Sequence, residues 1–127
     1  MSKTSTLRKL VRDMMQTVTG DTYHKRPPSE AAYPYKVYRL SSVDFLNSDR
    51  DDLELEVDIW DRNATADPKA AEEIADRLEA LFNSTLNPQP PLFPAFFRDA
   101  RYDLEDPDKN LIHIQLRFQV QLHEMED

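Results

Sequence analysis

The chain has 127 residues, no cysteine, a single glycine and a formal net charge of −8. The length is that of one ordinary domain, so we expect residues 1–127 to fold as a single domain. Without cysteine the chain has no disulfide, thiolate metal site or cysteine nucleophile, and one glycine excludes the phosphate-binding loops that need several. No apolar run is long enough to span a membrane, and the N-terminus lacks the features of a signal peptide.

The charge is distributed unevenly. Residues 1–26 carry a net charge of +4, and the remainder carries −12. An acidic body argues against a groove that binds nucleic-acid phosphates, since such grooves depend on many Lys and Arg contacts. Two interpretations stay open: two solvated faces of opposite sign, or head-to-tail contact between subunits. The basic candidates for such a contact are Arg8, Lys9 and Arg12.

The first predicted element is an amphipathic helix. Apolar residues from Leu7 to Val18 recur with a helical period. Gly20 stands where a glycine in the left-handed conformation would end the helix. We expect the apolar stripe to cover a sheet and the basic residues to face solvent.

Two strands are predicted next. Residues 21–32 are expected to form a polar loop, and the aromatic segment 33–40 predicts a strand with Pro34 at an edge or at its start. Residues 41–52 are expected to connect it to residues 53–60, whose strict alternation predicts a half-buried strand. The polar face of this strand carries four candidate contact residues: Glu54, Glu56, Asp58 and Trp60.

A second helix should begin at Asp67 and Pro68, which suit the N-cap and the first helical position. Its apolar stripe runs to Phe82, and the segment 83–97 then contains four prolines and no glycine. This segment is either a loop laid over the core or a stiff arm that docks on a neighbouring subunit. The candidate docking residues of the arm are Leu92, Phe93, Phe96 and Phe97.

The C-terminal part predicts a hairpin. Residues 100–105 and 112–123 alternate between apolar and polar side chains, and the residues between them favour a turn. We therefore predict an α+β fold of order α-β-β-α-β-β, with an antiparallel-rich sheet of about four strands and two helices on one face. The other face would be charged and open, and free strand edges would be available to a partner.

The sequence contains no recognisable catalytic motif. His24, His113 and His123 fall in no known pattern, and the last two are expected at the surface of a strand. A partial match to a calcium-binding loop begins at Asn47, but Asp58 takes the place of the bidentate Glu that ends such loops. We therefore predict no enzymatic activity, metal or cofactor.

The run AYPYKVY at residues 32–38 resembles the opening strand of small tail-completion proteins of long-tailed bacteriophages and prophages. An amphipathic helix precedes it, as in that family. A strand ending in Ile59-Trp60-Asp61 and an Ala-rich helix ending in Leu78-Glu79-Ala80-Leu81 follow it. The resemblance covers about residues 5–82 and lacks the glycine-containing turn that usually follows the first strand.

The resemblance implies a structural protein that forms a homo-oligomeric ring, commonly hexameric, on the end of the tail tube. It implies the tail tube protein and a head–tail connector protein as partners, and DNA that passes through the lumen without specific binding. It places the protein in the virion tail, after assembly in the host cytoplasm, and away from membranes. Our candidates for the lumen lining are Glu54, Glu56 and Asp58.

Three alternatives stay open at this point. The chain could be a head-side connector or minor capsid component, a small acidic enzyme or binding domain, or a generic scaffold with no phage role. The basic residues of the first helix could meet an acidic neighbour in either of the assembly models.

Overall fold

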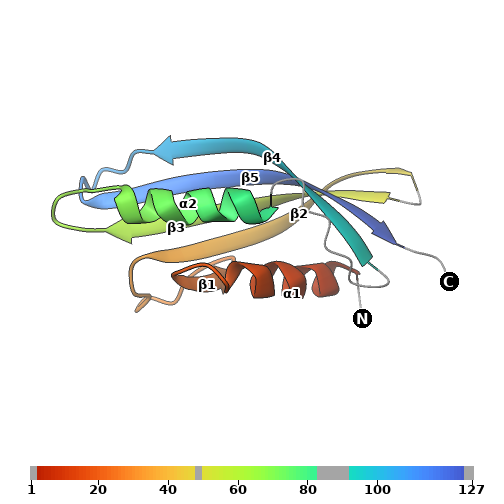
Figure 1. Ribbon diagram of the computed structural model, residues 1–127, viewed down its shortest axis with the longest axis horizontal. Helices are drawn as coiled ribbons and strands as arrows, with labels where there is room; N and C mark the ends of the chain where they lie inside the picture. The colour runs from red at the N-terminus through yellow and green to blue at the C-terminus, as the bar shows by residue number, and fades with distance from the viewer. Residues whose placement is uncertain (1–2, 48–49, 83–91, 125–127) are drawn as a thin grey trace.

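The computed structural model describes residues 3–47, 50–82 and 92–124. It has two helices and five strands in this part of the chain (Figure 1). The elements are α1 (Lys3–Met15), β1 (Asp21–His24), β2 (Tyr35–Asn47), β3 (Arg50–Arg62), α2 (Lys69–Phe82), β4 (Leu92–Leu104) and β5 (Leu111–Glu124). The fold is α+β, as the sequence predicts.

The strands form one mixed sheet in the order β1-β2-β3-β5-β4. β1 runs parallel to β2, and the other neighbouring pairs are antiparallel. Both helices lie on the same face, with α2 over β3 and β5 and α1 alongside β2, where it also contacts β4 (Figure 1). The prediction of two helices on one face is confirmed, while the sheet has one strand more than expected.

The additional strand is β1, in the segment expected to be a loop. Its four residues pair with the first residues of β2, from Asp21 beside Tyr35 to His24 beside Tyr38. So short a strand has almost no periodicity, and only the neighbouring chain supplies its hydrogen bonds. The sequence pattern therefore could not separate it from a polar loop.

The long strands also extend further than predicted. β2 and β3 continue through most of residues 41–52, the expected connection, and β4 begins at Leu92 and not near residue 100. Residues 50–62 form a strand, so the helix that would leave a calcium-binding loop is not there. Of that partial motif, residues 48–49 lie outside the described part of the chain.

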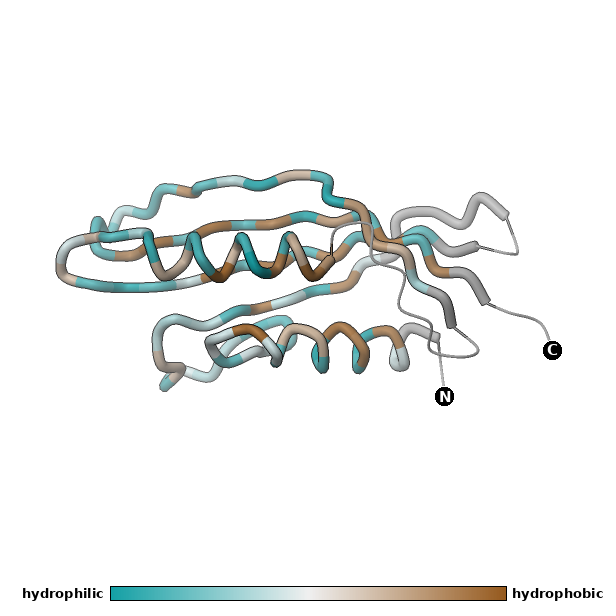
Figure 2. The backbone as a smooth tube through the Cα atoms, viewed as in Figure 1, coloured by the Kyte–Doolittle hydropathy of each residue, from teal (hydrophilic) through white to brown (hydrophobic). Residues whose placement is uncertain are grey.

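The core lies between the helices and the apolar face of the sheet. Figure 2 shows hydrophobic and hydrophilic residues alternating along both helices and the central strands. Leu7, Val11 and Met15 of α1 are fully buried, as are Leu78 and Phe82 of α2. Each large side chain of this kind contributes roughly 1.5–3 kcal/mol by leaving water. The stripes predicted for both helices are therefore confirmed as core.

Lys36 links α1 to the sheet in a way that the sequence did not reveal. Its side chain is fully buried on the helical side of β2, and α1 ends at Met15, before Gly20. Lys36 Nζ donates to the carbonyl oxygens of Met15 at 3.1 Å, Val18 at 2.6 Å, Thr19 at 3.1 Å and Gly20 at 2.7 Å. Burial lowers the pKa of Lys36 to about 8, against a smaller opposing effect of Asp21. The ammonium group thus caps the end of α1.

Candidate assembly surface on the open face of the sheet

The face of the sheet opposite the helices carries most of the candidate residues. The strand register places side chains of four strands in rows across it. We call these the aromatic row (Tyr35, Trp60, His113 and Leu104), the polar row (Val37, Asp58, Gln115 and Tyr102) and the charged row (Arg39, Glu56, Arg117 and Ala100). A fourth row contains Ser41, Glu54, Gln119 and Phe97.

In the polar row, Asp58 is buried, although we expected it in solvent with the other acids. It is 8% exposed. His113 Nε2 lies 2.6 Å from Asp58 Oδ1, and the Gln115 amide donates to the same oxygen at 3.1 Å. Burial raises the pKa of Asp58, but the hydrogen bonds from His113 and Gln115 outweigh it and hold the pKa below its usual value. His113 is therefore not a solvated surface residue, because its ring is hydrogen-bonded to the buried carboxylate of Asp58.

Trp60 packs on this pair. Its ring stacks on His113 with the centroids 3.7 Å apart and the planes at 15°. Because β3 lies in the middle of the sheet, Trp60 lies away from both sheet edges. A shallow concavity of about 440 Å³ opens beside it, and its lining includes residues 25–27, Val37 and Asp58.

In the charged row, Glu56 lies between two guanidinium groups. Arg39 is 3.9 Å and Arg117 is 3.8 Å from its carboxylate oxygens. Burial raises the pKa of Glu56, and the charge of nearby Asp58 raises it further, while the two arginines oppose the shift. Arg117 also lies over the ring of Tyr102, 5.7 Å from its centroid. Glu54, by contrast, forms no ion pair in the described part of the chain. Of the three acids along the open face of β3 (Glu54, Glu56 and Asp58, here called the acidic row), two are therefore paired, and the acidic row carries less unpaired charge than the sequence indicates.

The aromatic residues of the predicted arm have different positions. Phe96 is fully buried, and its ring centroid is 5.0 Å from that of Phe82. Phe97 is 38% exposed on the open face. The structure therefore places Phe96 in the core, and its assignment as a docking residue is wrong for this reason. The side chains of Leu92 and Phe93, like residues 83–91, lie outside the described residues.

The basic candidates are separate from the open face. Arg8, Lys9 and Arg12 lie on α1, beside the β1–β2 edge and on the opposite side of the sheet from the charged row. Arg12 is 3.6 Å from the neighbouring Asp13, a half-exposed pair that contributes little to stability.

Sequence reasoning also missed Tyr102 and Leu104, which are 45% and 40% exposed near the end of β4.

The stability of the Asp58 site should depend on pH. Because the folded-state pKa is below the unfolded value of about 3.9, Asp58 stabilises the fold above that pH, and the contribution is lost as pH falls through the folded-state pKa. We expect Asp58→Asn to lower the free energy of unfolding by about 1 kcal/mol at pH 7. The difference from wild type should shrink below about pH 4.

Urea unfolding of both proteins between pH 3 and pH 8 measures this difference. The exposed Asp103 provides a matched control, since Asp103→Asn removes the same charge without a buried hydrogen bond. A difference between wild type and Asp58→Asn that stays constant down to pH 3 would contradict the assignment.

The described residues contain no group of three or more His, Cys, Asp or Glu side chains arranged to hold a metal ion. Within the same residues, neither helix is both long and apolar enough to cross a bilayer.

The open face carries paired charges, a stacked aromatic ring and exposed apolar side chains. These are the components of a protein interface.

Comparison with known proteins agrees with this description. Residues 5–123 match the family model described as Tail completion protein gp17. A chain from the virion of a native gene transfer agent particle has a TM-score of 0.65 at 10% identity, over 90% of this chain and 84% of that chain. A second solved structure has a TM-score of 0.73 at 11% identity, over 95% of this chain and 93% of that chain. No curated protein sequence matches the chain.

At these identities the two solved structures establish a shared fold, while the family match identifies the chain. It extends from α1 into β5 and therefore includes both helices and the open face. It confirms the resemblance drawn from residues 32–38 and extends it beyond residue 82. The chain belongs to the Tail completion protein gp17 family and has a structural role in phage tail completion.

Proposed function

We propose that this protein forms a homo-oligomeric ring on the end of the tail tube, stops tube growth and joins the tail to the head. The family match over residues 5–123 is the observation that carries this proposal. The protein acts by assembly and not by catalysis. Its partners are further copies of itself, the tail tube protein and the head–tail connector protein, and it assembles in the host cytoplasm before it becomes part of the virion tail.

The geometry of the fold supports a ring. We propose one domain over residues 1–127, supported by the described residues, in which both helices pack on one sheet around one hydrophobic core. The sheet ends in two different edges, β1 and β4. Contact between unlike surfaces of identical subunits is heterologous and closes into a ring when the rotation permits.

The acidic row on β3 is our candidate for the lumen lining. Glu54 forms no ion pair in the described part of the chain, whereas Glu56 lies near two arginines and Asp58 bonds to His113. A lumen with net negative charge would repel DNA, so DNA could pass through it without specific binding. In this arrangement Glu54 contributes most of the unpaired charge of the row.

A pull-down with purified components distinguishes the tail from the head. The tagged protein is incubated separately with tail tubes and with connector rings. We expect capture of tail tubes without connector present, because the ring completes the tail before joining. Capture of connector alone, with no binding to tail tubes, would favour a head-side component and contradict the proposal.

A further inference from the structure

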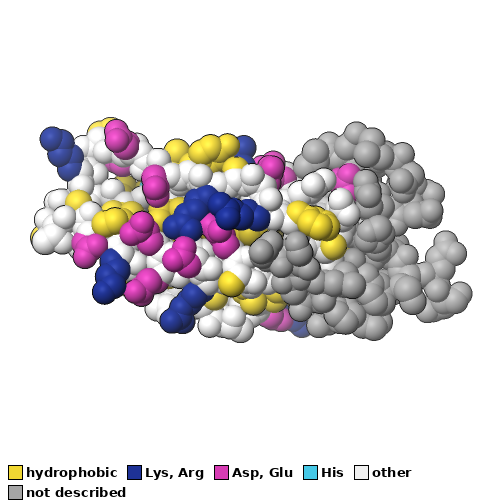
Figure 3. Space-filling model, turned by 45° about the horizontal axis from the view of Figure 1, so that its top comes forward, with side chains coloured by type: hydrophobic (Ala, Val, Ile, Leu, Met, Phe, Trp, Pro, Cys, Tyr) yellow, Lys and Arg dark blue, Asp and Glu magenta, His cyan; other side chains and the backbone are white. Residues whose placement is uncertain are grey.

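The C-terminal half of β4 is an exposed sheet edge with an apolar surface. β4 is the last strand of the sheet and pairs only with β5 in the described residues. Phe97, Tyr102 and Leu104 project from its open-face side and are 38%, 45% and 40% exposed. Figure 3 brings this border of the molecule forward and shows hydrophobic side chains along it, with acidic and basic side chains nearby. Unpaired strand edges with exposed apolar side chains are ready to bind another chain.

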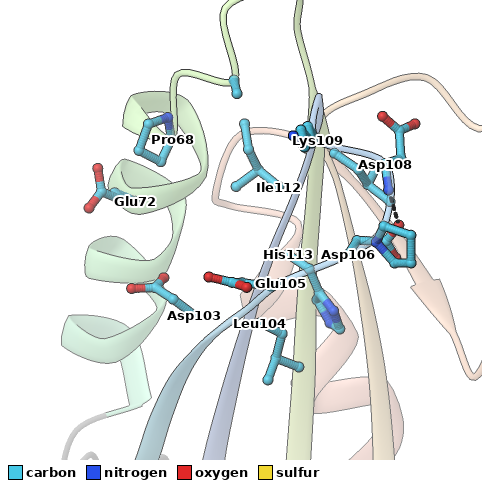
Figure 4. Close-up of a pocket in the computed structure, with 13 residues that line it drawn as sticks. Pro68, Glu72, Asp103, Leu104, Glu105, Asp106, Asp108, Lys109, Ile112 and His113 are labelled. Atoms are coloured by element: carbon cyan, nitrogen blue, oxygen red, sulfur yellow. Dashed lines mark hydrogen bonds between the residues drawn. The ribbon is translucent and has the colours of Figure 1, made fainter.

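This edge is also acidic at its end. Asp103 and Glu105, together with Glu72 of α2, line a cleft of about 570 Å³ beside Leu104 (Figure 4). These three carboxylates form no ion pair in the described part of the chain. Two acids further along α2, Asp76 and Glu79, form ion pairs with Arg101 of the same subunit, each at 2.8 Å.

The opposite edge of the molecule has the complementary character. It consists of α1, β1 and the start of β2 (Figure 1). Tyr33 is 43% exposed and packs on Tyr35, whose ring lies 5.9 Å from that of Tyr23. On the same edge, α1 presents Arg8 and Arg12, which lie near Tyr38 of β2. Each molecule therefore carries on one side an apolar edge where Asp103 and Glu105 form no ion pair within the described residues, and on the other an aromatic edge where Arg8, Lys9 and Arg12 outnumber Asp13 and Asp21.

We propose that the Phe97–Leu104 half of β4 in one copy packs against the α1–β1 edge of a second copy, with Asp103 and Glu105 facing Arg8 and Arg12. Charge complementarity selects this occupant, because two β4 edges would bring acids together and two α1–β1 edges would bring bases together. The contact joins unlike surfaces, so it propagates around a ring. The inference rests on the proposed ring and names the surfaces that would build it.

Two charge-reversal variants test the pairing. The first, Asp103→Lys with Glu105→Lys, makes the β4 edge basic. The second, Arg8→Glu with Arg12→Glu, makes the α1 edge acidic. Self-association is measured by sedimentation velocity with tail tubes present and absent, and circular dichroism verifies folding. Each variant alone should weaken self-association at least about tenfold, because every contact would join like charges.

An equimolar mixture of the two variants should recover assembly. In an alternating arrangement, the basic β4 edge of the first variant meets the acidic α1 edge of the second, and the other contacts keep their native charges. Glu73→Lys, a reversal at an exposed position on α2, serves as control and should assemble as wild type does.

The possible failures are distinguishable. Assembly of both variants alone at wild-type strength would overturn the edge pairing and leave the ring proposal intact. Two impaired variants that fail to assemble when mixed would also overturn the pairing. A wild-type protein that never self-associates, even on tail tubes, would overturn the ring proposal itself.

Discussion

Replacing Lys36 with Met should lower the free energy of unfolding by about 3 kcal/mol. The side chain is fully buried, and its ammonium group donates to four carbonyl oxygens between Met15 and Gly20. Met fills a similar volume but donates no hydrogen bond. The carbonyl groups at the end of α1 would then lose their partner, and each unsatisfied buried group costs about 1–3 kcal/mol.

Urea denaturation followed by circular dichroism measures the loss. Lys109→Met is the matched control, because Lys109 is exposed in the turn between β4 and β5, and its effect should stay within about 0.5 kcal/mol. A Lys36→Met protein as stable as the control variant would contradict the role of Lys36 as the cap of α1.

Phe96→Ala should cost about 3–5 kcal/mol of folding stability, whereas Phe97→Ala should cost less than about 1 kcal/mol. Phe96 is fully buried in a cluster in which Phe82 lies 5.0 Å from Phe96 and 5.4 Å from Phe118. Removing its ring would leave a cavity among these rings. The adjacent Phe97 points to the open face and is 38% exposed.

The pair separates core packing from assembly. Thermal or urea unfolding gives the stability of each variant, and sedimentation gives its self-association. We expect Phe97→Ala to remain stable and to associate less strongly, since Phe97 lies on the proposed β4 surface. If Phe96→Ala kept full stability and lost only self-association, residue 96 would belong to an interface, and its assignment to the core would be wrong.

Much of the fold could be predicted because it depends on local periodicity. The alternation from Leu53 to Ile59 identified one face of β3, and the stripe from Ala71 to Phe82 identified the buried side of α2. Both patterns report which side of an element is apolar. They do not report where a strand ends when its side chains become polar or proline-rich, so the extents of β2 and β4 were underestimated.

The candidate site was less predictable, because it depends on register between distant segments. His113 and Asp58 are 55 residues apart in the sequence and adjacent in the sheet. Neither residue type nor spacing indicates that pairing. Lys36 reads as one polar position in an aromatic strand, and only the packing of α1 shows why a cation is buried there. The exposed Tyr102 and Leu104 were read as ordinary strand residues, although an edge position makes them available to a partner.

The surfaces fit a protein whose role is structural. The paired charges of Glu56 and Asp58 hold the open face in a defined arrangement, while Asp103, Glu105 and Arg8, which form no ion pair with the described residues, lie at opposite edges. Exposed charges of this kind contribute little to the stability of a monomer. Between subunits they can select partners and orient them.

The most direct test of ring formation on the tail is negative-stain electron microscopy of the purified protein mixed with tail tubes, supported by sedimentation of the protein alone. The account predicts rings, and tubes that carry such a ring at one end and no longer elongate when tail tube protein is added. A protein that remains monomeric at every concentration, and leaves tube ends bare and able to elongate, would contradict it.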